Sequence, residues 1–151
     1  MKAGCILLVL ATSAALADDS LKPPNDEAWA WLGDINMMPE GGWIPLVWAA
    51  SKDSIGFVSS KRYVREGSIV TFWMRWEYKP QSRYPSVLQR AQYDCTKAQY
   101  RSISQTSYTA NNMGGGSPES LTQLGQWSPI APGTMGETIM DFVCSINTKK
   151  K

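Results

Sequence analysis

The side chains of this chain that are best suited to covalent chemistry are the thiols of Cys95 and Cys144. Cys95 ends a stretch of alternating apolar and polar residues, and Cys144 ends an apolar stretch with helical spacing. Such thiols can form a disulfide, bind a metal ion or act as nucleophiles. Because the chain begins with the features of a secretory signal, both cysteines should reach an oxidising compartment, where structural disulfides are common. We therefore predict a disulfide between them.

The export signal is expected at residues 1–17. Lys2 gives a positive start, an apolar stretch begins at Ile6, and residues 15–17 read Ala-Leu-Ala, which fits a cleavage site. The apolar stretch is shorter than the roughly 20 residues that a membrane-spanning helix needs. Cys5 precedes it, whereas the acylated cysteine of a lipoprotein follows it. The expected product is soluble and exported, periplasmic or secreted to the cell surface, with no convincing lipobox and no membrane span.

Residues that could carry catalysis are few. The sequence contains no histidine, which removes the usual general base and the most common metal ligand. A carboxylate-dependent hydrolase would need two opposed carboxyl groups, and the candidates do not pair by spacing. These candidates are Glu66, Glu77, Asp94, Glu119, Glu137 and Asp141. We predict a protein that is not an enzyme, with no catalytic residues, no cofactor and no metal.

The elements that would position functional side chains are mainly strands. The clearest strand is 68–78, where Val70, Phe72 and Met74 alternate with polar residues on the other face, Trp73 being an apolar exception. Thr134 and Glu137 form a capping box that starts a C-terminal helix. The pattern predicts an α+β fold, with one antiparallel sheet of about five to six strands and a C-terminal helix tethered by the disulfide. Strands are expected at 43–50, 54–59, 68–78, 86–95 and 99–108.

The mature chain divides into a polar lead segment or linker at 18–42, a domain at 43–146 and a basic tail at 147–151. Within the lead segment, a short helix is expected near residues 26–32. Its Trp29, Trp31 and Leu32 either fold back onto the domain, which we favour, or form an arm that docks onto a partner. The stretch 111–125, with three consecutive glycines, is expected to be a flexible loop. It lacks the lysine and the strand–helix context of a phosphate-binding loop.

Four stretches of the sequence carry a recognisable pattern: the run 91–95, Tyr100-Arg101, the segment 126–137 with its Trp-Ser-Pro-Ile-Ala-Pro-Gly core, and Val143-Cys144. In these stretches the chain resembles the surface-adhesin protein E-like domain family of exported Gram-negative bacterial proteins. The resemblance covers roughly residues 43–144. The resemblance implies an antiparallel sheet with a disulfide-tethered helix, no enzymatic activity and no cofactor. It also implies a surface role in which host matrix or plasma proteins are bound.

A non-catalytic protein-binding module is therefore the favoured function. Trp73, Arg75 and Arg101 are the expected partner-binding residues, since aromatic and arginine side chains anchor many interfaces. For Trp73, packing beneath the 111–125 loop is an equal alternative, and the two arginines could simply be solvated. Lys149, Lys150 and Lys151 are most simply a solvated tail, although a terminal lysine also suits the lysine-binding modules of plasminogen.

Nucleic acid and a second copy of the chain are two other classes of partner. A formal net charge of +2 is too small to indicate non-specific binding of nucleic acid. An exposed sheet edge could instead support a homodimer, in which case the protein would have a periplasmic structural or assembly role in the envelope.

Overall fold

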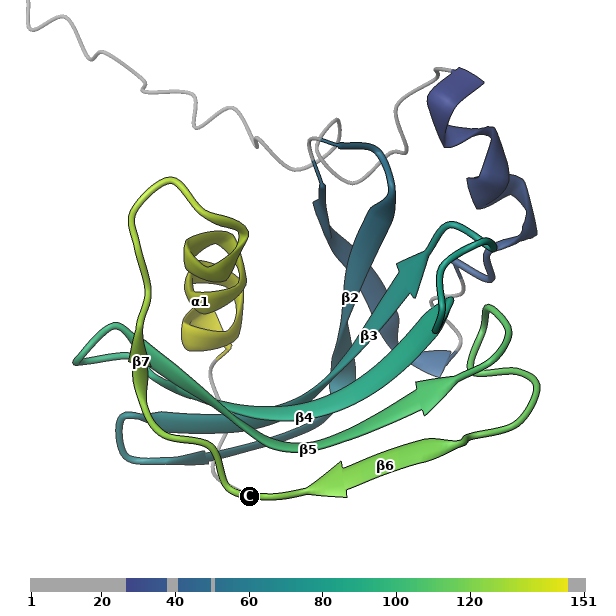
Figure 1. Cartoon of the computed structure of the whole chain (residues 1–151). Coiled ribbons are helices and arrows are strands. Elements are labelled where there is room, and N and C mark those ends of the chain that lie inside the picture. The colour runs from purple at the N-terminus through teal and green to yellow at the C-terminus, as the bar shows by residue number, and fades with distance from the viewer. Residues whose placement is uncertain (1–26, 38–40, 50, 147–151) are drawn as a thin grey trace, which may run out of the picture.

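The computed structural model describes residues 27–37, 41–49 and 51–146 (Figure 1). The predicted signal at 1–17 and tail at 147–151 lie outside these residues. A short 3-10 helix, η1 (Glu27–Asp34), is followed by a strongly curved antiparallel sheet and by a C-terminal helix, α1 (Met135–Ser145). In Figure 1, α1 lies in the hollow of the sheet. The expected α+β fold is confirmed.

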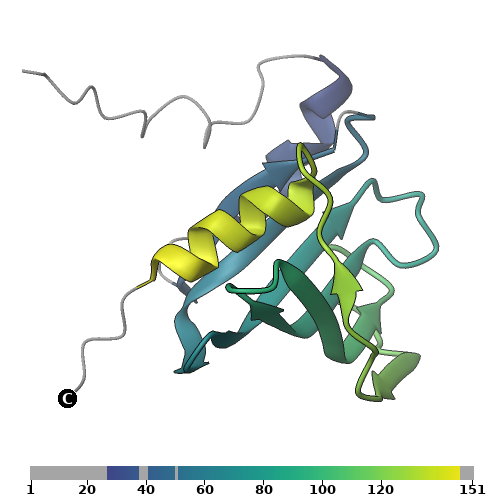
Figure 2. The same cartoon turned by 90° about the vertical axis from the view of Figure 1, so that its left-hand side faces the viewer.

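The sheet is a meander in which each strand pairs with its neighbour in the sequence, in the order β1-β2-β3-β4-β5-β6. A seventh short strand, β7, pairs with the start of β5. Figure 2 shows α1 running along the sheet. The strands are β1 (Trp43–Trp48), β2 (Ser54–Glu66), β3 (Ile69–Tyr78), β4 (Ser86–Asp94), β5 (Gln99–Tyr108), β6 (Glu119–Thr122) and β7 (Ser128–Pro129).

One strand prediction was too short, and one loop prediction was wrong in part. The strand expected to end at Ser59 continues to Glu66, because a register shift between Val58 and Tyr63 lets β2 bulge and then resume its pairing with β3. The stretch 111–125, expected to be a flexible loop, contains β6, which pairs with β5. Neither the bulge nor the short edge strand has a strong local signature, so periodicity alone missed both.

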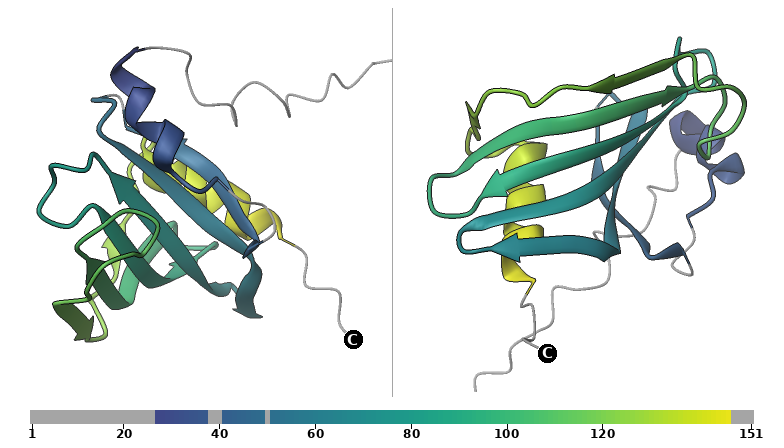
Figure 3. Two further views of the ribbon diagram at one scale, coloured as in Figure 1. Left: turned by 90° about the vertical axis from the view of Figure 1, so that its right-hand side faces the viewer. Right: turned by 90° about the horizontal axis from the view of Figure 1, so that it is seen from below.

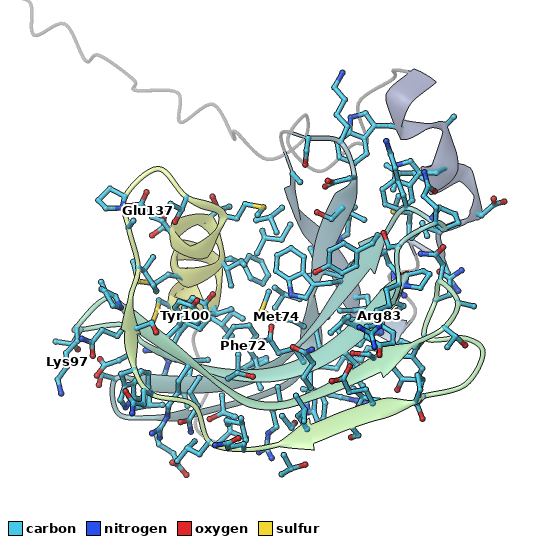
Figure 4. All side chains as sticks on the ribbon, viewed as in Figure 1. Phe72, Met74, Arg83, Lys97, Tyr100 and Glu137 are labelled. Carbon is cyan, nitrogen blue, oxygen red and sulfur yellow. A yellow bond between two sulfur atoms is a disulfide. The ribbon has the colours of Figure 1, made fainter. Side chains whose placement is uncertain are left out.

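The inner face of the sheet, which α1 covers, carries the main hydrophobic core. Val70, Phe72 and Met74 of β3 pack with Ile139 and Val143 of α1. Figure 4 shows Phe72, Met74 and Tyr100 on this side of the sheet. The helix starts as predicted: the Thr134 hydroxyl accepts a hydrogen bond from the Glu137 amide, and the Glu137 carboxylate accepts one from the Gly133 amide at 2.7 Å.

The outer face of the sheet, opposite α1, is partly covered by the lead segment. Trp29, Leu32 and Ile35 pack on Ile55 and Phe57 of β2 and form a second, smaller core. The left panel of Figure 3 shows η1 and α1 on opposite sides of β1 and β2. Trp29 and Leu32 therefore fold back onto the sheet, in agreement with the favoured interpretation of this segment.

The predicted disulfide is present between Cys95 and Cys144, with Cα atoms 5.8 Å apart. It joins the turn after β4 to the last turn of α1, across a sequence separation of 49 residues. The Arg65 guanidinium donates to the carbonyl of Cys144 and so holds the same helix end against β2. The helix is thus attached covalently at its C-terminal end and by side-chain packing along its length.

Removing this disulfide should destabilise the domain without changing its fold. A Cys95→Ser, Cys144→Ser double variant is expected to lose about 4 kcal/mol of unfolding free energy, because the unfolded chain regains the entropy of a loop of this size. Urea unfolding of the oxidised protein and of the variant measures this difference. The variant in reducing and non-reducing buffer is the control, and equal stability of oxidised protein and variant would contradict the expectation.

Candidate binding face

The outer face of β3 is divided into a covered half and an open half. Thr71, Trp73, Arg75 and Glu77 alternate along it, opposite the inner-face residues. Arg75 and Glu77 lie beneath the lead segment and the loop that begins at Asn111. Thr71 and Trp73 lie beyond this cover and are half-buried. The two halves of one strand face therefore have different roles.

Arg75 was expected on a polar, partner-facing surface, and the structure corrects this expectation. Its side chain is only 3% exposed. The guanidinium donates a hydrogen bond to the carbonyl of Asn36 at 2.6 Å and lies 4.0 Å from the centre of the Phe57 ring. Burial lowers the pKa of Arg75, and the neighbouring Glu77 carboxylate opposes that shift. Arg75 anchors the lead segment and is not available on the surface.

Glu77 is the buried counter-charge of Arg75. Its carboxylate is fully buried, with Oε1 3.4 Å from Nε of Arg75. It accepts hydrogen bonds from the Ser86 hydroxyl at 2.9 Å, from the Asn111 side-chain amide at 2.9 Å and from the Asn112 backbone amide at 3.0 and 3.1 Å. The carboxylate oxygens are thus held by donors, and this arrangement suits a structural ion better than a general acid or base.

Asn112 connects the buried ion pair to the lead segment. Its side-chain oxygen accepts a hydrogen bond from the Asn36 amide at 2.6 Å, and its side-chain nitrogen donates to the Asp34 carbonyl at 2.9 Å. Its backbone φ of 60° lies in the left-handed region, where asparagine is one of the better-tolerated residues. The 111–113 turn therefore ties together the end of β3, the start of β4 and residues 34–36.

The open half of the outer face presents Trp73 in a shallow trough of about 300 Å³. Cations from β2 and β4 surround this tryptophan: Lys61 and Arg62 come from the β2 bulge, and Arg90 is the direct cross-strand neighbour of Trp73. The Ser59 hydroxyl, which is almost fully buried, accepts hydrogen bonds from the amides of Lys61 and Arg62 and so shapes the bulge. We call Lys61, Arg62, Trp73 and Arg90 the basic–aromatic trough.

Arg101 lies on the same outer face, beside the trough. Its Nε donates to the Gln92 side-chain oxygen at 2.7 Å, and Gln92 in turn donates to the Thr71 hydroxyl at 3.1 Å. The guanidinium also lies 4.4 Å from the centre of the Trp127 ring. These contacts fix the orientation of Arg101, so Trp73 and Arg101 are brought to one face of three adjacent strands.

The sequence pattern does not identify Lys61, Arg62, Arg90 or Trp127 as site residues. Arg90 was recognisable as a polar position of an alternating strand, but its proximity to Trp73 depends on the β3–β4 register. Lys61 and Arg62 follow the strand expected at 54–59, because the bulge conceals the continuation of β2 in the sequence. Trp127 belongs to the longer motif at 126–137. Lys149, Lys150 and Lys151 lie outside the described residues.

A second hollow lies on the inner face, between the sheet and the first turn of α1. It has a volume of about 430 Å³ and is mainly apolar, with Met74, Trp76, Tyr100 and Met135 among its walls. Burial raises the pKa of Tyr93, another wall residue, and the nearby Tyr100 adds to this shift. Tyr93 is therefore a neutral packing residue at physiological pH.

Comparison with known proteins identifies the family of this fold. The family model for surface-adhesin protein E matches residues 43–145. The chain belongs to the surface-adhesin protein E family. A crystallographic comparison agrees: one structure of Haemophilus influenzae protein E has a TM-score of 0.55 and 15% identity, over 74% of this chain and 89% of that one. The selenomethionine form of that protein has a TM-score of 0.54 and 16% identity, over 85% of this chain and 95% of that one.

At these identities the solved structures show a shared fold. No curated protein matches the chain significantly. Membership of the surface-adhesin protein E family supports an adhesin-like role as an exported surface protein, and favours a protein without enzymatic activity. Among the residues described, no three histidine, cysteine or acidic side chains gather as a metal site. No helix within the same ranges is long and apolar enough to span a membrane.

Glu77→Gln should destabilise this surface-adhesin protein E domain by about 3–5 kcal/mol. The substitution leaves Arg75 as a buried charge without its counter-ion, which is costly, and places an amide donor where two N–H groups already point. Urea unfolding measures the loss. Glu66→Gln is a matched control, because Glu66 is exposed at the end of β2 and its change should stay within about 0.5 kcal/mol. Equal stabilities of the two variants would contradict the assigned role of Glu77.

Proposed function

We propose that this protein is an exported, non-catalytic module that binds a protein partner through the open half of its outer sheet face. Trp73 and Arg101 would be the central contacts. The observation that carries the proposal is the placement of a half-buried tryptophan on β3 among arginines from β2, β4 and β5, next to a half of the same face that the lead segment already covers.

The arrangement has the features of an energetic centre for binding. Tryptophan and arginine are the residues most enriched in interface hot spots. Here they stand on paired strands, and Arg101 is held by Gln92 and Trp127. Side chains that are held in place before binding lose less entropy when a partner arrives. Family membership makes host matrix or plasma proteins the first partners to test.

The assembly alternative, dimerisation through a sheet edge, has weaker support. The edge strand β1 is apolar, but Pro45 lies in its middle, where the register with β2 also shifts. Proline on an edge removes a backbone donor and discourages further strand pairing. Size-exclusion mass at several concentrations tests this alternative, and a strictly monomeric protein would remove it.

A Trp73→Ala variant should bind an immobilised host partner at least tenfold more weakly than the parent protein, since truncating a hot-spot aromatic costs about 2 kcal/mol or more. Surface plasmon resonance against a panel of host matrix and plasma proteins gives the measurement, and circular dichroism checks the fold. Leu121→Ala is the matched control: this leucine is 54% exposed on β6 and lies apart from the trough. Binding that Trp73→Ala leaves unchanged would exclude this face.

The basic tail offers a separate prediction. Deleting Lys149, Lys150 and Lys151 tests the tail as a ligand for lysine-binding modules, which recognise an ammonium paired with a carboxylate. If lysine-binding modules recognise it, binding to immobilised plasminogen should be lost and a lysine analogue should compete with the intact protein. The more economical expectation is that the deletion changes nothing, because short runs of like charge are commonly solvated tails. Unchanged plasminogen binding removes the tail from the binding surface.

Export itself is testable by protease treatment of intact cells that express the full chain, with a periplasmic protein as marker. Digestion of the domain while the marker survives would support a surface location. Protection until the outer membrane is opened would direct the search to periplasmic partners.

A further inference from the structure

The basic–aromatic trough has a one-sided charge. Three of its eight lining residues, Lys61, Arg62 and Arg90, are cationic, and none of the eight is acidic. The whole chain, by contrast, is nearly balanced, with 15 basic and 13 acidic residues. A concentration of one sign in a concave site attracts ligands of the opposite sign.

The arginines of the trough are also not neutralised from within the molecule. Arg62 and Arg90 are exposed, and neither has an ion-pair partner among residues 27–37, 41–49 and 51–146. Asp94, an acidic residue further along β4, is held in its own turn by the amides of Thr96 and Lys97. The guanidinium groups of Arg62 and Arg90 are therefore able to form paired hydrogen bonds with a carboxylate.

The size and floor of the trough restrict the ligand further. A volume of about 300 Å³ is at the small end of ligand sites, which span roughly 300–1,000 Å³. Trp73 supplies an aromatic surface beside the cations, and Tyr63, Val64 and Phe72 contribute to the walls. Such a site suits one apolar side chain with negative groups close on either side.

We propose that the basic–aromatic trough recognises an acidic peptide segment, in which one apolar or aromatic residue is flanked by aspartate or glutamate. The apolar side chain would pack on Trp73, and the flanking carboxylates would bind Arg62 and Arg90. This inference rests on the proposed function. It specifies the chemistry of the partner segment that the outer face binds.

Polyanions of other classes fit the trough less well. Affinity for a nucleic-acid backbone grows with the number of phosphates that lysine and arginine neutralise, whereas only three cations line this trough. A sulfated sugar chain would likewise draw its binding energy from repeated anionic groups along a longer basic track. The combination of few cations with an aromatic centre favours a short acidic and apolar peptide.

The test uses the oxidised full-length mature protein and a fluorescein-labelled peptide that contains Glu-Asp-Phe-Asp-Glu. The control peptide replaces its acids with Gln and Asn. Fluorescence anisotropy measures binding at low and at physiological salt, because exposed charge pairs are weakened by screening. We expect the acidic peptide to bind, the neutral peptide to bind at least tenfold more weakly, and affinity to fall as salt rises.

Substitutions of trough residues test whether the peptide binds at the trough. Arg90→Glu and Trp73→Ala should each weaken binding of the acidic peptide at least tenfold. Arg83→Glu is the matched control, because Arg83 is exposed in the β3–β4 connection, outside the trough, and the substitution changes net charge by the same amount. Arg83, labelled in Figure 4, lies far along the sheet from α1. An equal loss in Arg83→Glu and Arg90→Glu would mean unspecific attraction and would overturn the proposal.

Other results separate this inference from the proposed function. If the acidic peptide fails to bind while Trp73→Ala still abolishes binding to a host protein, acidic recognition is wrong and the binding face stands. If a heparin oligosaccharide binds the trough and the acidic peptide does not, the ligand is a sulfated sugar and the proposal is overturned. If the acidic peptide binds as expected but no host protein binds, the trough is an acidic-peptide site, and the proposal of a host partner is rejected.

Discussion

The buried carboxylate of Glu77 is the interaction on which the arrangement of the outer face depends. It receives donors from β4, from the 111–113 turn and from Arg75, while Arg75 reaches the lead segment through Asn36. A buried charge is tolerated only when it is paired and hydrogen-bonded. One of these donors, Asn112, lies 35 residues from Glu77 in the chain. The hydrogen-bonded network around the ion pair is therefore complete only when sheet, turn and lead segment are assembled together.

The inner face is stabilised by a different kind of interaction. There, non-directional packing of Phe72, Met74, Ile139 and Val143 holds α1 in the hollow of the sheet, and the Cys95–Cys144 bond limits how far the helix can move. The inner face of the sheet is therefore packed against α1, and most of the stabilising apolar contacts lie on that side. The open half of the outer face can therefore carry exposed and charged residues without weakening the main core, since its stability comes from the opposite surface.

The sequence was a good guide wherever the information is local. Alternation identified β3, the Thr134–Glu137 capping box located the start of α1, and the cysteines with the export signal indicated the disulfide. Polar character misled for Arg75 and Glu77, because their burial depends on Asn36 and Asn112, far away in the sequence. The trough was missed for a similar reason: a bulge in β2 and the β3–β4 register together bring Lys61, Arg62 and Arg90 around Trp73.

Arg75 and Arg90 show how one sheet face can hold two arginines with opposite roles. Both belong to outer-face positions of adjacent strands, yet Arg75 is buried with a counter-ion and an aromatic neighbour, and Arg90 is exposed beside Trp73. The lead segment accounts for the difference, because it covers Arg75 and does not reach Arg90. An arginine that is neutralised within the fold contributes to stability. One that retains its charge beside an aromatic surface remains able to bind a carboxylate from another molecule, and the proposal that the open half binds a partner rests on this asymmetry.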